Sequence, residues 1–155
     1  MKREWSLDGQ WTLYYGDAIC HETFDEEKLE CVPAQVPGNV ELDLSRAGVL
    51  PEDLFKGMNP CKAEKYESYD WWYCKEFDAP QRDLDEKVFL YFEGVDCLAE
   101  YELNGQIIGT SNNAFIPHEF EVTNLLQEKN VLRVHIRSAL LEQLKMPYAQ
   151  YLLSA

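Results

Sequence analysis

The fold of this chain is decided by residues 69–77, which read Tyr69-Asp70-Trp71-Trp72-Tyr73-Cys74-Lys75-Glu76-Phe77. Large apolar side chains recur with a period of two at Trp71, Tyr73 and Phe77, which is the period of a β-strand with one buried face. Adjacent residues of a strand point to opposite faces, so one of the two tryptophans lies outside the core. That side chain either offers a flat platform for a sugar ring or is covered by another domain or loop, and we favour the covered position.

Similar alternation recurs along the rest of the chain, in short runs separated by turn residues. Residues 11–15 and 97–103 each place large apolar side chains on one face, and Asn104-Gly105 is the strongest hairpin signal in the chain. Residues 88–92 are apolar on both faces and therefore predict a central strand. Together these patterns predict an all-β fold, an antiparallel sandwich or barrel. Further strands are expected at residues 31–36, 115–122 and 132–136.

One short helix is expected at residues 40–47, where apolar side chains fall on one helical face. Asn39 fits the N-cap position and Gly48 fits the position that ends a helix. After residue 138 the alternation stops, and the apolar tail shows neither a cap nor a natural end. We therefore expect one domain over residues 1–138 and a truncated C-terminal segment, residues 139–155, that leads to the remainder of a longer protein.

Acidic residues exceed basic ones by two to one, 28 against 14, and give a net charge of −14. This charge repels phosphate backbones and anionic lipid surfaces, so neither nucleic acid nor a membrane is an expected partner. No stretch approaches the roughly 18 consecutive apolar residues of a spanning helix. The N-terminus has no apolar signal core, although a signal peptide that had been removed would leave no trace.

Five cysteines occur in the chain, an odd number with no C-x-x-C pair. This pattern fits neither a disulfide framework nor a zinc site, and we expect free thiols, no metal and no cofactor. Free thiols favour a cytoplasmic location, but the compartment stays open because a periplasmic parent that had lost its signal peptide would have the same sequence.

Catalytic residues are not evident in the sequence, and the known nucleophile, metalloprotease and nucleotide-binding motifs are absent. Two pairs of glutamates, Glu100 with Glu102 and Glu119 with Glu121, share a strand face and could in principle provide the two carboxyl groups of a glycosidase. A solvated sheet surface explains the same alternation better. His135 lies between two arginines on another strand, and we favour cross-strand pairing over anion binding there.

Several segments in fixed order resemble the N-terminal sugar-binding domain of glycoside hydrolase family 2, in particular its β-mannosidase-like branch. Near the start they are Trp5-Ser6-Leu7-Asp8-Gly9-Gln10-Trp11 and Val36-Pro37-Gly38-Asn39-Val40, followed by Asp70-Trp71-Trp72-Tyr73. The later ones are Phe92-Glu93-Gly94-Val95-Asp96, Leu103-Asn104-Gly105, Asn113-Ala114-Phe115-Ile116-Pro117 and Val134-His135-Ile136-Arg137-Ser138. The resemblance spans nearly the whole chain.

This resemblance implies a galactose-binding-like jelly-roll β-sandwich within a much longer β-mannosidase-like or β-galactosidase-like enzyme. In that family both catalytic glutamates lie on a downstream barrel, so no catalytic residue is expected here. The resemblance also implies that a loop before the tryptophan pair reaches the active site, and within it Asn59 is the candidate substrate-binding residue. Its amide can donate to and accept from sugar hydroxyls, or it can satisfy its own turn. The expected partners are the downstream domains of the parent chain and the carbohydrate at its active site.

Two other functions remain possible for such a domain. A free-standing carbohydrate-binding module requires an exposed aromatic platform. A purely structural interaction domain instead requires a large apolar patch on one edge.

Overall fold

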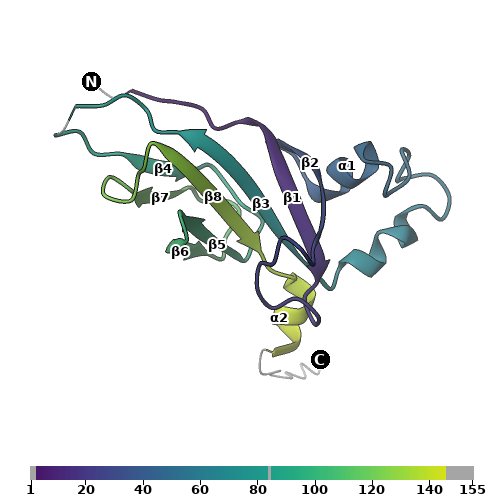
Figure 1. Ribbon diagram of the computed structural model, residues 1–155. Helices are drawn as coiled ribbons and strands as arrows, with labels where there is room; N and C mark the ends of the chain where they lie inside the picture. The colour runs from purple at the N-terminus through teal and green to yellow at the C-terminus, as the bar shows by residue number, and fades with distance from the viewer. Residues whose placement is uncertain (1–2, 84, 146–155) are drawn as a thin grey trace, which may run out of the picture.

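Two antiparallel sheets make up the described part of the chain, residues 3–83 and 85–145 of this computed structural model (Figure 1). The larger sheet has six strands in the order β2-β1-β3-β8-β5-β6, and the smaller pairs β4 with β7. Neighbouring strands are therefore often distant in sequence, and the expected antiparallel β-sandwich is confirmed. The strands are β1 Gly9–Asp17, β2 Glu30–Val36, β3 Tyr69–Asp78, β4 Phe89–Phe92, β5 Ala99–Leu103, β6 Gln106–Ser111, β7 His118–Glu121 and β8 Lys129–Ile136.

Strand β3 lies in the middle of the larger sheet, between β1 and β8, as the tryptophan pair requires. Trp71 faces the core and stacks on Tyr15, with ring centroids 5.6 Å apart. Trp72 points the other way, yet it is only 2% exposed. Its indole stacks on the His135 ring at 4.5 Å, and Phe24 from the loop between β1 and β2 packs against its edge. The expectation that a loop covers the outer tryptophan is confirmed.

The hairpin between β5 and β6 turns at Asn104 and Gly105, as the sequence predicts. Both residues have positive φ angles, 53° and 83°, which a two-residue hairpin turn of this hand requires. The Asn104 amide also donates to the Leu125 carbonyl at 2.9 Å and to Asn130 at 3.0 Å. The turn is thereby tied to the loop that precedes β8.

The apolar sequence of residues 88–92 predicts a central strand, and this prediction is wrong for β4. Among the described residues it pairs only with β7, and Phe89 and Tyr91 on its outer face are 44% and 57% exposed. The partner β7 starts at His118, three residues later than expected, because Pro117 has no backbone N–H to donate to a ladder. Phe115, expected within this strand, is 95% exposed in the preceding loop.

Helix α1, Val40–Arg46, agrees with the expected helix, and the Asn39 side chain caps it by accepting from the Leu42 N–H at 2.9 Å. A second short helix, α2 Ala139–Lys145, lies where the sequence predicts no element. Its cap is Ser138, whose hydroxyl accepts from the Leu141 N–H at 3.2 Å. Because Ser138 also ends the alternation of β8, its capping role was not evident from the pattern. Two 3-10 turns, η1 Pro60–Lys62 and η2 Glu64–Tyr66, interrupt the predicted long loop.

The expected domain boundary at residue 138 stays a prediction; β8 ends at Ile136 and α2 starts at Ala139. Of the expected C-terminal segment, residues 146–155 lie outside the described residues. All five cysteines are described, and none of them forms a disulfide. Neither α-helix within the described ranges is long and apolar enough to cross a membrane.

Candidate functional site

Helix α1 is fixed to the sandwich by a buried carboxylate, and this helix leads into the loop that carries Asn59. Asp43 is fully buried and accepts from the Gln35 backbone N–H on β2 at 3.1 Å and from the Tyr73 hydroxyl on β3 at 3.4 Å. Arg46 donates to the same carboxylate at 2.8 Å from the solvent side. Burial and the Asp43 carboxylate together raise the pKa of Tyr73, which keeps its hydroxyl available as a donor.

Asn59 lies between α1 and β3, and its position is held by the loop's own hydrogen bonds. Its amide nitrogen donates to the Asp53 carbonyl at 2.7 Å, and its backbone N–H donates to the Lys56 carbonyl at 3.1 Å. Gly57, between these partners, has φ of 59°, a conformation that suits glycine. Neither bond uses the side-chain oxygen of Asn59, and among the described residues this oxygen has no hydrogen-bond partner. It can therefore accept a hydrogen bond from a ligand.

The loop around Asn59 projects apolar side chains from one end of the sandwich. Phe55 is 95% exposed and Met58 is 74% exposed. The other end of the loop is anchored in the core, because Tyr66 is buried against Tyr69 and Trp71 with ring centroids 5.0 and 6.1 Å away. A rigid base thus carries an exposed apolar tip, an arrangement that suits contact with another surface.

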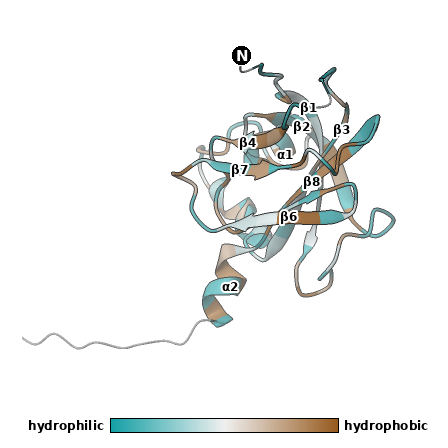
Figure 2. Cartoon of the chain, turned by 90° about the vertical axis from the view of Figure 1, so that its left-hand side faces the viewer, coloured by the Kyte–Doolittle hydropathy of each residue, from teal (hydrophilic) through white to brown (hydrophobic). Residues whose placement is uncertain are grey.

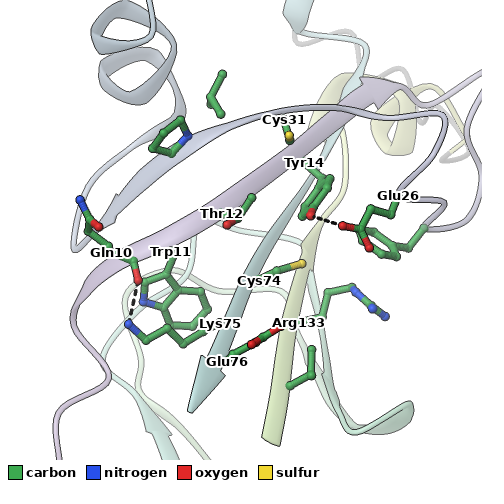
Figure 3. A pocket seen from close by; sticks show the side chains of 14 residues that line it. Gln10, Trp11, Thr12, Tyr14, Glu26, Cys31, Cys74, Lys75, Glu76 and Arg133 are labelled. Carbon is green, nitrogen blue, oxygen red and sulfur yellow. Dashed lines mark hydrogen bonds between the residues drawn. The ribbon is translucent and has the colours of Figure 1, made fainter.

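A second candidate site is a groove of about 610 Å³ on the outer face of the larger sheet (Figure 3). In Figure 3 the hydroxyl of Tyr14 points toward Glu26, to which it donates at 2.8 Å, and this bond raises the pKa of Tyr14 to about 12. Cys74 lies on the groove floor, and burial raises the pKa of its thiol to about 11. Arg133 also lines the groove, with its guanidinium 3.9 Å from the centre of the Phe24 ring. Asn59 does not line this groove.

Glu100 and Glu102, the first of the two glutamate pairs considered as catalytic carboxylates, form ion pairs with arginines. Glu102 pairs with Arg133 at 2.5 Å, and Glu100 pairs with Arg137 at 3.7 Å. His135, on the same face, is bound to Asp70 at 2.8 Å. The interpretation of this strand face as cross-strand pairing is confirmed.

The other glutamate pair lies on the outer face of β7, open to solvent. Glu121 pairs with Lys87 at 2.9 Å, and this bond lowers the pKa of Glu121. The lowered pKa of Glu121 disfavours the protonated form that an acid catalyst needs. Among the described residues, no three His, Cys, Asp or Glu side chains gather closely enough to hold a metal ion.

Sequence reasoning located the Asn59 loop but missed Asp43 and the Tyr14–Glu26 pair. An acidic residue directly before Leu44 on the buried side of the helix was the available signal for Asp43. The sequence offered no such signal for the Tyr14–Glu26 pair, because Glu26 lies in the irregular loop between β1 and β2. As a substrate-binding residue, Asn59 stays a prediction.

Comparison with known families gives a match over residues 20–151 to the domain described as "Glycosyl hydrolase 2 galactose-binding domain-like". This agrees with the jelly-roll sandwich that the sequence resemblance implied. The β-mannosidase of Rattus norvegicus is 32% identical over 136 residues, which cover 87% of this chain and 14% of that enzyme.

Solved structures show the same relationship in three dimensions. The β-D-mannosidase from Dictyoglomus thermophilum superposes with a TM-score of 0.76 at 36% identity, over 92% of this chain and 17% of that one. A β-glucuronidase from Faecalibacterium prausnitzii gives a TM-score of 0.63 at 25% identity, over 86% of this chain and 20% of that one. The chain therefore spans less than a quarter of the length of each of these relatives.

Proposed function

Because the chain belongs to the galactose-binding-like domains of glycosyl hydrolase family 2, we propose that it is the non-catalytic N-terminal sugar-binding domain of a retaining β-glycosidase. The observation that carries this proposal is the agreement in both sequence and fold with a β-D-mannosidase, 36% identity at a TM-score of 0.76. The ion pairs of Glu100, Glu102 and Glu121 support it, since these three carboxylates bind basic side chains on the sheet faces.

The substrate we propose for the longer enzyme is a β-mannoside. The relatives named β-mannosidase are 32% and 36% identical to this chain, whereas the β-glucuronidase is 25% identical. The partners are the downstream domains of the same polypeptide, which supply the catalytic glutamates. In this arrangement the exposed Phe55 and Met58 side chains contact the catalytic domain.

Asn59 is the residue that we propose to touch the substrate. Its amide nitrogen donates to the Asp53 carbonyl, and its side-chain oxygen is left to accept from a sugar hydroxyl. The bond fixes the side chain before substrate arrives, so little side-chain entropy is lost on binding. The loop follows α1, whose Ser45 hydroxyl donates to the Pro51 carbonyl at 3.0 Å, and α1 is anchored to β2 by its buried Asp43.

The test is the Asn59→Ala variant in a longer enzyme that carries this domain, assayed on aryl β-mannosides. Loss of one hydrogen bond to the substrate lowers kcat/KM by up to about tenfold. Asn59→Asp keeps an acceptor but loses the donor to Asp53, so it separates substrate contact from loop support. Asn124→Ala, an exposed turn residue elsewhere, is the matched control.

Unchanged kinetics in Asn59→Ala, with a lower unfolding temperature, assign Asn59 to its own turn and remove it from the substrate site. Faster hydrolysis of β-glucuronides than of β-mannosides by the unmodified enzyme contradicts the proposed substrate. Each result bears on a separate part of the proposal.

A further inference from the structure

The outer face of the β4–β7 sheet carries aromatic side chains that the core does not use. On the inner face, Leu90 is buried and Phe92 packs on Tyr101, with ring centroids 4.5 Å apart. On the outer face, Phe89 and Tyr91 remain about half exposed. Figure 2 looks onto this side of the molecule, and neither described helix overlies the two strands there. These two rings require a reason other than packing within this domain.

Carboxylates lie directly opposite both rings on the neighbouring strand. In the antiparallel register Tyr91 faces Glu119 and Phe89 faces Glu121. Directly opposed residues have Cβ atoms about 5 Å apart, and the two rings follow each other along the strand at about 7 Å. The face therefore presents a short row of two aromatic rings with a parallel row of hydrogen-bond acceptors.

This arrangement matches the two surfaces of a sugar ring. The C–H face of a pyranose packs on an aromatic ring, while its hydroxyls donate to carboxylates at the ring's edge. Lys87, at 2.9 Å, and the Thr123 hydroxyl, at 3.3 Å, both bind Glu121 and hold it in place. Because two rings follow each other along the strand, they can contact two sugar units of a linear oligosaccharide but only one monosaccharide ring each. The face therefore favours an oligosaccharide.

The charge of the chain selects among such ligands. A net charge of −14, together with the two carboxylates on this face, repels acidic polysaccharides and other polyanions. A neutral chain avoids this repulsion and gains hydrogen bonds from the same carboxylates. The face is therefore suited to neutral oligosaccharides.

We propose that the outer face of the β4–β7 sheet, formed by Phe89, Tyr91, Glu119 and Glu121, binds a neutral oligosaccharide of linked hexoses. This platform lies at the opposite side of the molecule from α1 and the Asn59 loop (Figure 1). It is a second sugar site, independent of the one proposed around Asn59. Because the platform is flat and open to water, its affinity is in the millimolar range, about 1 mM or weaker.

The test is a ¹H–¹⁵N NMR titration of the 155-residue chain with β-1,4-linked mannohexaose and with cellohexaose, which differ in the configuration of one hydroxyl in each sugar unit. We expect saturable shift changes concentrated in residues 89–92 and 118–121, and weaker effects from the acidic hexagalacturonate. Tyr91→Ala weakens binding about two- to tenfold, whereas Tyr91→Phe, which keeps the ring, retains most of it. Ile107→Ala on β6 removes an apolar side chain of similar exposure, 55%, and leaves binding unchanged.

Several outcomes overturn the platform. Absence of shift changes up to about 50 mM of either hexasaccharide excludes it. Binding that is unaffected by both Tyr91→Ala and Phe89→Ala, in variants whose spectra show the native fold, places the sugar elsewhere. Shift changes on this face that appear only with protein concentration assign it to contact between copies of the chain. Asn59→Ala should leave binding to the platform unchanged. The titration therefore tests the platform alone, and the kinetics of Asn59→Ala test the proposed substrate contact alone.

Discussion

Replacement of Asp43 by alanine tests whether the Asn59 loop depends on the buried carboxylate beneath α1. The variant removes the acceptor of two donors, the part-buried Gln35 N–H and the buried Tyr73 hydroxyl. Each unsatisfied buried donor costs about 1–3 kcal/mol. Arg46 loses its partner too, but its side chain is 56% exposed, so that ion pair contributes less than about 1 kcal/mol.

Asp43→Ala also removes the cost of burying a negative charge, and this gain offsets part of the loss. The net destabilisation is therefore about 2–4 kcal/mol. For a domain of this size, 1 kcal/mol corresponds to about 2–4 °C in unfolding temperature. The expected decrease is therefore about 4–16 °C. Circular dichroism during heating and in urea measures it, with an unchanged urea slope as evidence that the unfolded state is the same.

Two variants in the same helix serve as controls for this prediction. Arg46→Ala removes only the exposed partner, and Glu41→Ala removes an exposed carboxylate from the first turn. Each is expected to cost less than about 1 kcal/mol. Hydrogen exchange should accelerate in residues 40–59 for Asp43→Ala alone. A loss below about 1 kcal/mol for Asp43→Ala, or an equal loss for Arg46→Ala, refutes the reasoning.

Three further predictions concern catalysis, the loop and alkaline pH. The purified 155-residue chain should hydrolyse no aryl β-glycoside, and turnover above background that a single Glu→Gln change abolishes would contradict the assignment. Gly57→Ala should cost about 1–2 kcal/mol in thermal unfolding because its φ of 59° is strained for alanine, although no atom lies within 4 Å of the added Cβ. The pKa values of Cys74 and Tyr14 rise from 9.0 and 10.0 to about 11 and about 12, so the folded state holds both protons more tightly. The free energy of unfolding should be constant below pH 9 and decline as the pH rises from 9 to 12. In Cys74→Ala and in Tyr14→Phe this decline should be less steep. An unaltered decline in both variants would assign it to other groups.

Local chemistry in the sequence determined most of the sandwich. The period of two at Trp71 and Tyr73, the Asn104-Gly105 turn and the Asn39 cap each act within a few residues, and all three appear as predicted. Such signals depend on backbone conformation and on which face of an element is apolar. They can therefore be interpreted without knowledge of the neighbouring strands.

Tertiary structure alone decided what lies against each face. The apolar sequence of β4 was compatible with a central strand, but its neighbours depend on pairing with β7, almost thirty residues away. The cover on Trp72 comes from Phe24 and His135, and the anchor of α1 comes from Asp43 accepting from β2 and β3. Asn59 was identifiable as a loop residue, whereas its bond to the Asp53 carbonyl depends on how the loop closes. Burial is a property of contacts between segments distant in sequence, so the same side chain can serve as core or as exposed surface until those segments meet.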